Sequence, residues 1–289
     1  MTATHTLETR GAGIVYDVRG PLPTADGRPP LLLIGQPMTA GGFATLASLL
    51  PERTVVTYDP RGLGRSIRTD GRTDNDPAVQ AEDVHAVIEA LGSGPVELFA
   101  SSGGAVTALA LVAAHPHDVT TLVAHEPPII PVLPDAEAAE RARTGYRDAY
   151  LAGGRGRGMA AFIAMTMWRG EFTDEYFAQP PADPAMLGMS AEDDGARDDP
   201  LLSDRSAAIT SYRPDAEALG SAPTRIVIAM GEESAGTFTG RASVATAELL
   251  GQEATVFPSH HGGFLGGEFG YAGQPEAFAH RLRQALDSG

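Results

Sequence analysis

The chain contains no cysteine and no lysine, and it has no long run of apolar residues. The absence of cysteine excludes disulfide bonds, thiolate catalysis and metal sites built on cysteine, but it leaves the redox compartment open. All 21 basic residues are therefore arginines, set against 37 acidic residues for a formal net charge of −16. A surface this acidic repels nucleic acid and anionic membranes, so neither is an expected partner.

The apolar segments are too short for a membrane span. The longest, residues 105–114, falls well below the ~20 residues that a spanning helix needs. The first residues, MTATHTLETRG, lack the basic segment and apolar run of a signal peptide, which favours a cytoplasmic location. The 289 residues are enough for one large domain or a domain with an insertion.

Strand patterns and helix patterns alternate in two separate parts of the chain. Continuous apolar runs bounded by turn residues predict buried strands, and amphipathic or capped segments predict helices. In order, these segments are LLLIG, VVTY, the helix at 76–92, VELFA, the helix at 103–116 and VTTLVAH, followed after a gap by RIVIAM, the helix at 240–251, TVF and the helix at 274–289. Such alternation predicts an α/β fold with a mostly parallel central sheet covered by helices on both faces.

The alternation stops between residues 129 and 221. This stretch contains helix-like segments such as AEAAERARTGYRDAYLAG and GMAAFIAMTMW, but it shows no buried strand pattern. We therefore predict a core formed by residues 1–128 and 222–289, with residues 129–221 as a helical cap, or lid, inserted into it.

The segment VELFASSGGAVTALALVAAHP places very small residues at a junction between a strand and a helix. A nucleophilic serine at such a turn is lifted clear of the sheet, next to the first N–H groups of the helix. The strained turn needs small residues two positions before and two positions after the nucleophile. Ser102 meets this condition with Ala100 and Gly104, whereas Ser101 would place Phe99 in one of those positions. The alternative is a tight turn with incidental serines.

With this turn as the first of four features, the chain resembles the α/β-hydrolase fold family over nearly its whole length. The second feature is LLLIGQPMTAGGF, which is similar to the family's oxyanion loop. The third is VVTYDPRGLGRS, in which Asp59 and Arg61 match a turn that we interpret as structural. The fourth is FPSHHGGF, which is similar to the family's histidine loop. The resemblance implies a cofactor-free serine hydrolase with no metal.

The resemblance also implies a catalytic base and an acid. Its histidine-loop pattern favours His261 over His260 as the base. The family's usual acid position is occupied here by Ser234, which cannot carry a negative charge. Glu126 at the end of VTTLVAHE is the favoured acid, because some members of the family place it there, and Glu233 or Glu232 is the alternative.

Two backbone N–H groups are expected to bind the oxyanion. Gly103 follows the nucleophile, and the second donor is Gln36, with Met38 as the alternative. Met38, Trp168 and Phe264 are candidate pocket residues, although Trp168 has the simpler interpretation of packing the cap.

The expected substrate is a small to medium apolar carboxylic ester or lactone, taken by a monomer or homodimer. Two alternatives stay open at this point. One keeps the three catalytic groups but hydrolyses a carbon–carbon bond or forms a peracid. The other is a non-hydrolytic lyase, cyclase or binding protein.

Overall fold

A computed structural model of the chain describes residues 2–270 and 272–288. Over this part, nine strands form one sheet in the order β1–β2–β4–β3–β6–β7–β8–β9, with β5 paired to β2. The strands are β1 (Thr2–Thr9), β2 (Ala12–Arg19), β3 (Leu31–Gln36), β4 (Val55–Tyr58), β5 (Ile67–Arg68), β6 (Val96–Ser102), β7 (Val119–His125), β8 (Arg225–Gly231) and β9 (Thr255–Phe257). The pairings of β2 are antiparallel, and the pairings from β4 to β9 are parallel.

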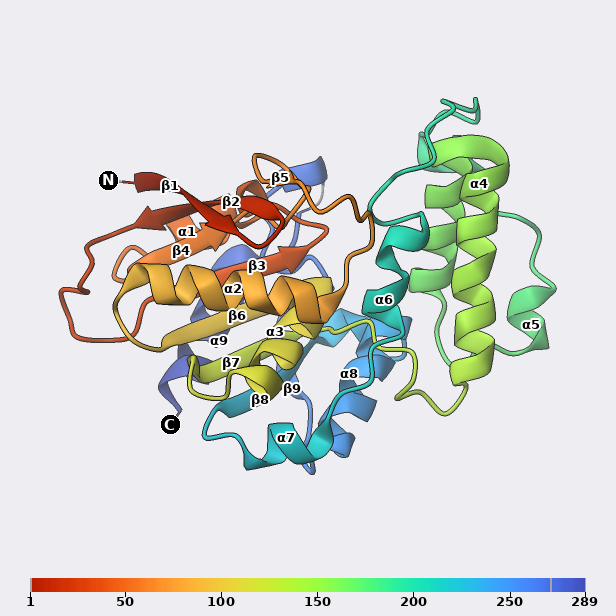
Figure 1. Ribbon diagram of the computed structural model, residues 1–289. Helices are drawn as coiled ribbons and strands as arrows, with labels where there is room; N and C mark the ends of the chain where they lie inside the picture. Colours follow the sequence, from red (N-terminus) through yellow and green to blue (C-terminus); the bar gives the residue numbers. More distant parts are fainter. Residues whose placement is uncertain (1, 271, 289) are drawn as a thin grey trace.

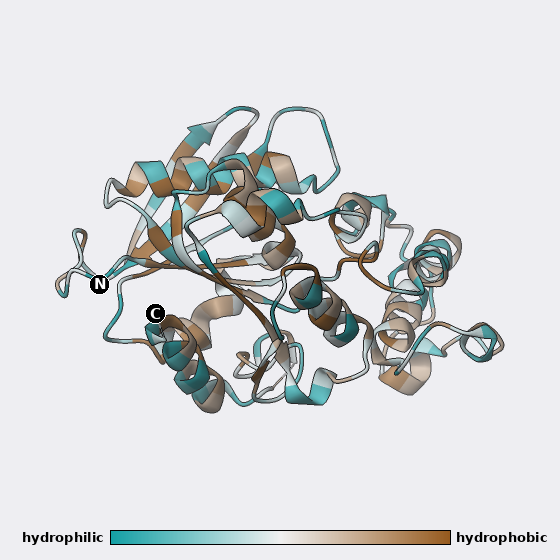
Figure 2. Ribbon diagram, turned by 90° about the horizontal axis from the view of Figure 1, so that it is seen from below, coloured by the Kyte–Doolittle hydropathy of each residue, from teal (hydrophilic) through white to brown (hydrophobic). Residues whose placement is uncertain are grey.

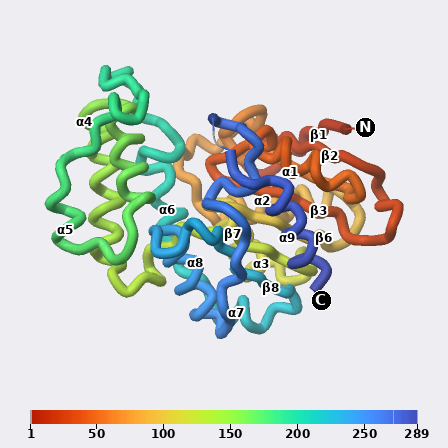
Figure 3. Tube along the Cα trace, turned by 180° about the vertical axis from the view of Figure 1, so that it is seen from behind, coloured from red at the N-terminus to blue at the C-terminus, as the bar shows by residue number. Residues whose placement is uncertain are grey.

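The central strands are apolar on both sides because helices cover both faces of the sheet. In β3, Leu32 and Ile34 belong to one apolar cluster, and Leu31 and Leu33 belong to the cluster on the opposite face. The first cluster includes residues of α2 (Pro77–Leu91) and α3 (Gly103–Ala114), and the second includes residues of α1 (Ala44–Ser48) and α9 (Pro275–Asp287). Figures 1 and 3 show these helices from the two sides. The predicted fold class is confirmed.

The segment between β7 and β8 is helical. It contains α4 (Ala136–Met167), α5 (Asp174–Phe177), the 3-10 turns η2 (Pro184–Leu187) and η3 (Asp204–Ser206), α6 (Ala207–Thr210) and α7 (Ala216–Ser221). Helix α4 has two halves joined at Gly153 and Gly154, and Gly154 takes a φ of +77°. Figure 1 shows the two halves side by side, with α4 and α5 beyond the edge of the sheet.

The last part of this segment packs on the core. Ile209 of α6 and Leu219 of α7 belong to the same cluster as α2 and α3, whereas α4 contributes to a separate cluster with Phe172 and Phe238. Within the predicted cap at 129–221, α6 and α7 therefore pack on the core, because they bury their apolar side chains against α3. Helix α4 has an apolar cluster of its own. Figure 2 shows brown apolar bands on the helices and teal polar residues along their other sides.

Four further elements connect the strands or follow them. They are η1 (Ala40–Phe43) after β3, η4 (Glu232–Ser234) and α8 (Phe238–Leu249) after β8, and η5 (Glu268–Gly270) after β9. In the part of the chain that the structure describes, none of the helices is both long enough and apolar enough to cross a bilayer.

Candidate active site

Ser102 sits at the junction between β6 and α3 in a conformation that non-glycine residues rarely adopt. Its φ is +58° and its ψ is −129°, and α3 begins at the next residue. Backbone strain of this kind costs on the order of 1–3 kcal/mol and persists only where the surrounding structure enforces it. Ser102 is partly exposed, and it precedes the free N–H groups of the helix. The turn thus presents a hydroxyl next to an array of backbone donors.

Two glycines permit α3 to lie close to β3. A Cβ atom on Gly104 would lie 2.6 Å from the Cα of Gly35, and one on Gly103 would lie 2.8 Å from the carbonyl oxygen of Gln36. Both distances are shorter than van der Waals contact, so neither position accepts a side chain without movement of the backbone. The small residues of the sequence motif therefore permit the close approach of α3 to β3.

The carboxylate of Glu126 is completely buried at the end of β7. Its Oε2 atom lies 2.6 Å from His261 Nδ1 and accepts a hydrogen bond of 2.6 Å from the Thr239 hydroxyl. Its Oε1 atom accepts a hydrogen bond of 2.9 Å from the N–H of Gly231. Glu126 also has a positive φ, +50°, which turns the chain at this strand end. A buried carboxylate held in this way fixes the orientation of the imidazole that it contacts.

The other two candidate acids, Glu232 and Glu233, follow the neighbouring strand β8. Glu233 is exposed, and Glu232 Oε1 accepts a hydrogen bond of 3.4 Å from the N–H of Ser259. Of the three carboxylates weighed from the sequence, Glu126 is the one that contacts His261.

Ser102 ends β6, and His261 is held by Glu126, which follows the neighbouring strand β7. Ser101 is paired with His125 in the parallel register of β6 and β7, so Ser102 is level with Glu126, which holds His261. No hydrogen bond joins Ser102 to His261 among the described residues. Contacts of this kind are often long without substrate and shorten when it binds. Nδ1 of His261 contacts Glu126, so Nε2 is the ring nitrogen that this carboxylate leaves open.

Three neighbours of Glu126 were missed by the sequence analysis. Thr239 donates to the carboxylate from α8, and Ser234 forms a hydrogen bond with it from the loop after β8. The imidazole of His125 is also fully buried, with Nε2 at 3.8 Å from Glu126 Oε1 and Nδ1 at 3.2 Å from the Ser101 hydroxyl. Ser234, at the position where the family usually carries its acid, thus contacts a carboxylate that follows the neighbouring strand β7.

Burial and neighbouring charges shift the pKa values of Glu126 and His125 in opposite directions. Burial raises the pKa of the Glu126 carboxyl, but the charge and hydrogen bond of His261, together with His125 and Ser234, lower it below its ordinary value overall. Burial lowers the pKa of His125 to about 4, against the opposing effect of the Glu126 carboxylate. At neutral pH the site therefore holds a charged Glu126 beside a neutral His125.

Strand β3 ends at Gln36, which is level with Ser102 in the register of β3 and β6. The side chain of Gln36 is buried against the backbone of Gly103, and both of its amide atoms lack a hydrogen-bond partner among the described residues. An unpartnered buried amide costs about 1–3 kcal/mol, and this one lies beside Ser102. Met38, in the loop after β3, folds back over Gly35 and Gly42.

The turn at Asp59 and Arg61 holds the neighbouring loops together. Asp59 accepts hydrogen bonds of 2.9 Å from the N–H of Ala40 and from the N–H of Arg65, and thus ties the loop after β3 to its own turn. Arg61 donates two hydrogen bonds of 2.6 Å to the buried carboxylate of Asp83. These contacts account for both residues as structural supports.

The structure places two of the candidate pocket residues in packed clusters. Only 2% of Phe264 is exposed, and its ring packs on Phe43, Phe99 and Phe278 beneath the site, so it lies in the core instead of on a pocket surface. Trp168 packs on Tyr176 and donates to the carbonyl oxygen of Glu171 within the β7–β8 segment. No contact of Trp168 with Ser102 or His261 is present in the described chain.

Comparison with known proteins agrees with this fold. The model of the alpha/beta hydrolase fold matches residues 29–184. The "Uncharacterized hydrolase YraK" of Bacillus subtilis (strain 168) is 30% identical over 287 residues, which cover 98% of this chain and 95% of that protein. The chain belongs to the α/β-hydrolase fold family, as the four sequence features indicated.

Solved structures share the fold over nearly the whole chain. An alpha/beta hydrolase from Sphaerobacter thermophilus DSM 20745 superposes with a TM-score of 0.63 at 23% identity and covers 98% of this chain and 100% of that one. A thermophilic esterase from Thermogutta terrifontis superposes with a TM-score of 0.62 at 18% identity and covers 99% of this chain and 98% of that one. At these identities the likeness concerns the fold alone.

Proposed function

We propose that this protein is a serine hydrolase that cleaves a carboxylic ester or lactone through an acyl-enzyme formed on Ser102. The observation that carries the proposal is the 2.6 Å contact between the buried carboxylate of Glu126 and Nδ1 of His261, at the sheet edge where Ser102 is held in a strained turn. The family, together with hydrolases among its relatives, supports the reaction class.

In the first half of the reaction, the Ser102 hydroxyl attacks the ester carbonyl while Nε2 of His261 takes its proton. Glu126 stabilises the imidazolium that forms and keeps its Nδ1–H pointed inward. The N–H groups of Gly103 and Gln36 bind the oxyanion. The tetrahedral intermediate then expels the alcohol, which receives the proton from His261, and the acyl group stays on Ser102.

In the second half, His261 takes a proton from water, and the resulting hydroxide attacks the acyl-enzyme. Collapse of this intermediate returns the proton to the Ser102 oxygen and releases the carboxylic acid. Serine as the nucleophile argues against epoxide or haloalkane hydrolysis, which in this fold uses a carboxylate nucleophile. The buried amide of Gln36 adds a preference for substrates with a polar atom next to the scissile carbonyl.

Two assays test the proposal. Wild-type protein should be labelled by a fluorophosphonate and should turn over p-nitrophenyl acetate, and Ser102→Ala should lose labelling and at least roughly 10³-fold in kcat/KM. Ser101→Ala is a matched control, because Ser101 carries the adjacent hydroxyl, which is buried and lies 3.2 Å from Nδ1 of His125. A wild-type protein that is neither labelled nor active would reject the hydrolase proposal and favour a non-hydrolytic relative.

A further inference from the structure

A second group of chemically active side chains lies away from Ser102. His85 belongs to α2, His115 follows α3, and Asp118 precedes β7. Helix α3 follows directly after Ser102 and has 12 residues, so its two ends lie about 18 Å apart at 1.5 Å per residue. Because α3 runs back along the parallel strands, the cluster is at the amino ends of the strands, opposite the proposed active site.

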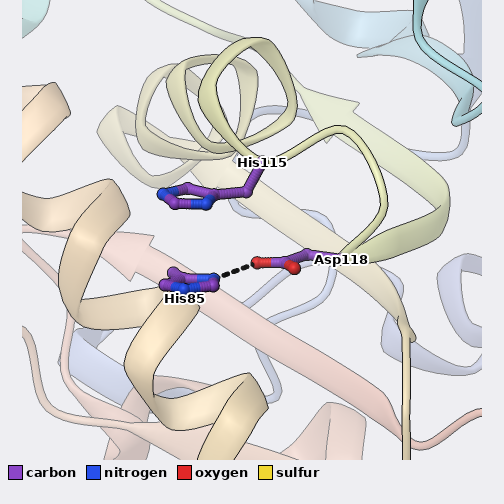
Figure 4. Close-up of side chains that lie close together, drawn as sticks. All are labelled: His85, His115 and Asp118. Atoms are coloured by element: carbon purple, nitrogen blue, oxygen red, sulfur yellow. Dashed lines mark hydrogen bonds and ion pairs between the residues drawn. The ribbon is translucent and has the colours of Figure 1, made fainter.

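The three side chains face one another closely. Nδ1 of His85 lies 2.7 Å from Oδ2 of Asp118, and the rings of His85 and His115 are stacked with centroids 3.8 Å apart. Figure 4 shows the two rings one above the other, with the Asp118 carboxylate beside them. One possible ligand atom from each residue lies within 4.8 Å of the others, and all three residues are partly buried.

Two of the three residues come from a rigid turn. The N–H of His115 bonds to the carbonyl oxygen of Leu111 at 2.7 Å, and the N–H of Asp118 bonds to the carbonyl oxygen of His115 at 3.1 Å. The carbonyl oxygen of Asp118 accepts a bond of 2.9 Å from the N–H of Val96. The backbone of this turn is therefore fixed before any ligand arrives, which lowers the entropy cost of binding.

Carboxylates of α2 contact the outer nitrogens of both rings. Glu82 Oε1 lies 2.9 Å from Nε2 of His115, and Glu89 Oε2 lies 3.9 Å from Nε2 of His85. This leaves Nδ1 of His115 and Nδ1 of His85 on the side of Asp118. A carboxylate on the far nitrogen of a histidine ligand orients the ring and raises its basicity, as it does around bound metals.

From this arrangement we propose that His85, His115 and Asp118 bind a divalent transition-metal ion, with Zn²⁺ as the reference case. Two imidazole nitrogens and one carboxylate oxygen suit Zn²⁺, Cu²⁺ or Ni²⁺, whereas Mg²⁺ and Ca²⁺ prefer sets of oxygen ligands. Ligand atoms around tetrahedral Zn²⁺ lie roughly 3.4 Å apart. Nδ1 of His85 and Oδ2 of Asp118, now 2.7 Å apart, therefore separate, and the partly exposed ring of His115 turns out of its stack with His85 to aim a nitrogen at the ion. Water completes the coordination.

Binding displaces the proton that His85 and Asp118 share and replaces their hydrogen bond with two metal bonds. The ion joins α2 to the turn between α3 and β7, two parts of the chain that otherwise meet here through side chains. Since the unfolded chain does not hold these residues together, the ion stabilises the folded state by mass action. This site is independent of the proposed hydrolase reaction.

Titration calorimetry with ZnCl₂ tests the proposal on the full-length chain without a histidine tag. Wild-type protein should bind one Zn²⁺ per chain at the cluster and melt at a higher temperature with Zn²⁺ than with EDTA, while Mg²⁺ should leave the melting temperature unchanged. His85→Ala and the nearly isosteric Asp118→Asn should weaken this binding by about 10-fold or more and abolish the thermal shift.

His117→Ala is the matched control, since His117 lies in the same turn but outside the cluster. It should bind Zn²⁺ as the wild type does. Wild-type protein without saturable binding, or binding of unchanged affinity and stoichiometry in Asp118→Asn, would overturn the proposal and leave the cluster as hydrogen-bonded packing. If His85→Ala does not fold in EDTA, as judged by circular dichroism, Asp118→Asn decides the question.

Discussion

The carboxylate of Glu126 and Nδ1 of His261 lie 2.6 Å apart, although 135 positions separate the two residues in the chain. Glu126 also accepts hydrogen bonds from Gly231 and Thr239, which come from β8 and α8. Ser234, from the loop after β8, contacts the same carboxylate. Separate elements of the chain thus converge on one buried carboxylate.

Replacement of Glu126 by glutamine should abolish most of the activity. The amide keeps the shape, but it has no charge to stabilise an imidazolium and its NH₂ group cannot accept the Nδ1–H. We expect kcat/KM for p-nitrophenyl acetate to fall by roughly 10³–10⁴-fold, with fold and melting temperature checked by circular dichroism. Glu233→Gln is the control, because Glu233 is exposed and should keep near-wild-type turnover. The reverse order of the two variants would assign the acid to Glu233.

Gln36→Leu should lower activity without lowering the stability of the fold. Leucine removes a buried amide that has no partner among the described residues, so the free energy of unfolding should stay the same or rise by about 1–3 kcal/mol. The value of kcat/KM should fall about 10-fold, because a donor beside the scissile carbonyl is lost while the backbone N–H remains. Urea denaturation and steady-state kinetics measure the two quantities.

Gln80→Leu is the matched control for this variant. Gln80 also has a buried amide without a partner among the described residues, but it lies on α2. It should change stability in the same direction and leave kcat/KM untouched. Equal kinetics in Gln36→Leu and wild-type protein would exclude a role for the Gln36 amide in substrate binding.

Gly104→Ala should destabilise the protein severely. The new methyl group would lie 2.6 Å from Gly35 Cα, and backbone atoms on that side cannot move away without distorting β3. We expect a loss of at least about 2–3 kcal/mol in the free energy of unfolding, measured in urea. Gly145→Ala is the control, because Gly145 is exposed in α4 with open space around its Cα. There alanine should raise helix stability by up to about 1 kcal/mol.

His125 should make the folded state sensitive to mild acid. Its pKa is lowered from 6.5 to about 4 by burial, so the unfolded chain binds a proton that the folded chain does not accept in this range. Stability is complete above pH 6.5 and is lost as the pH falls toward 4. Between pH 6.5 and pH 5, wild-type protein should lose about 1–2 kcal/mol more than His125→Leu, because the slope approaches 1.36 kcal/mol per pH unit only below pH 6.5.

Urea denaturation at a series of pH values measures this difference. The comparison with His125→Leu cancels the effect of the other histidines, which both proteins share. Parallel loss of stability in the two proteins over this range would show that His125 does not carry the acid sensitivity.

Several features were predictable because they depend on short stretches of sequence. The apolar runs and capped helices indicated a parallel sheet covered on both faces, and Ser102 was selected over Ser101 by the need for small neighbours. The structure contains that turn, with Gly104 packed against β3. Local sequence determines such features since strand burial, helix caps and tight turns involve residues only a few positions apart.

Other features depended on which strands become neighbours. The contact of Glu126 with His261, and the support from Thr239 across 113 positions, arise because β7 lies between β6 and β8. Phe264 was predicted beside the substrate, but its ring is in the core because Phe43, Phe99 and Phe278 surround it. The sequence by itself determined the class of fold and the turn at Ser102. Only the tertiary structure decided which carboxylate meets the histidine, because that contact depends on strand order and no local pattern encodes it.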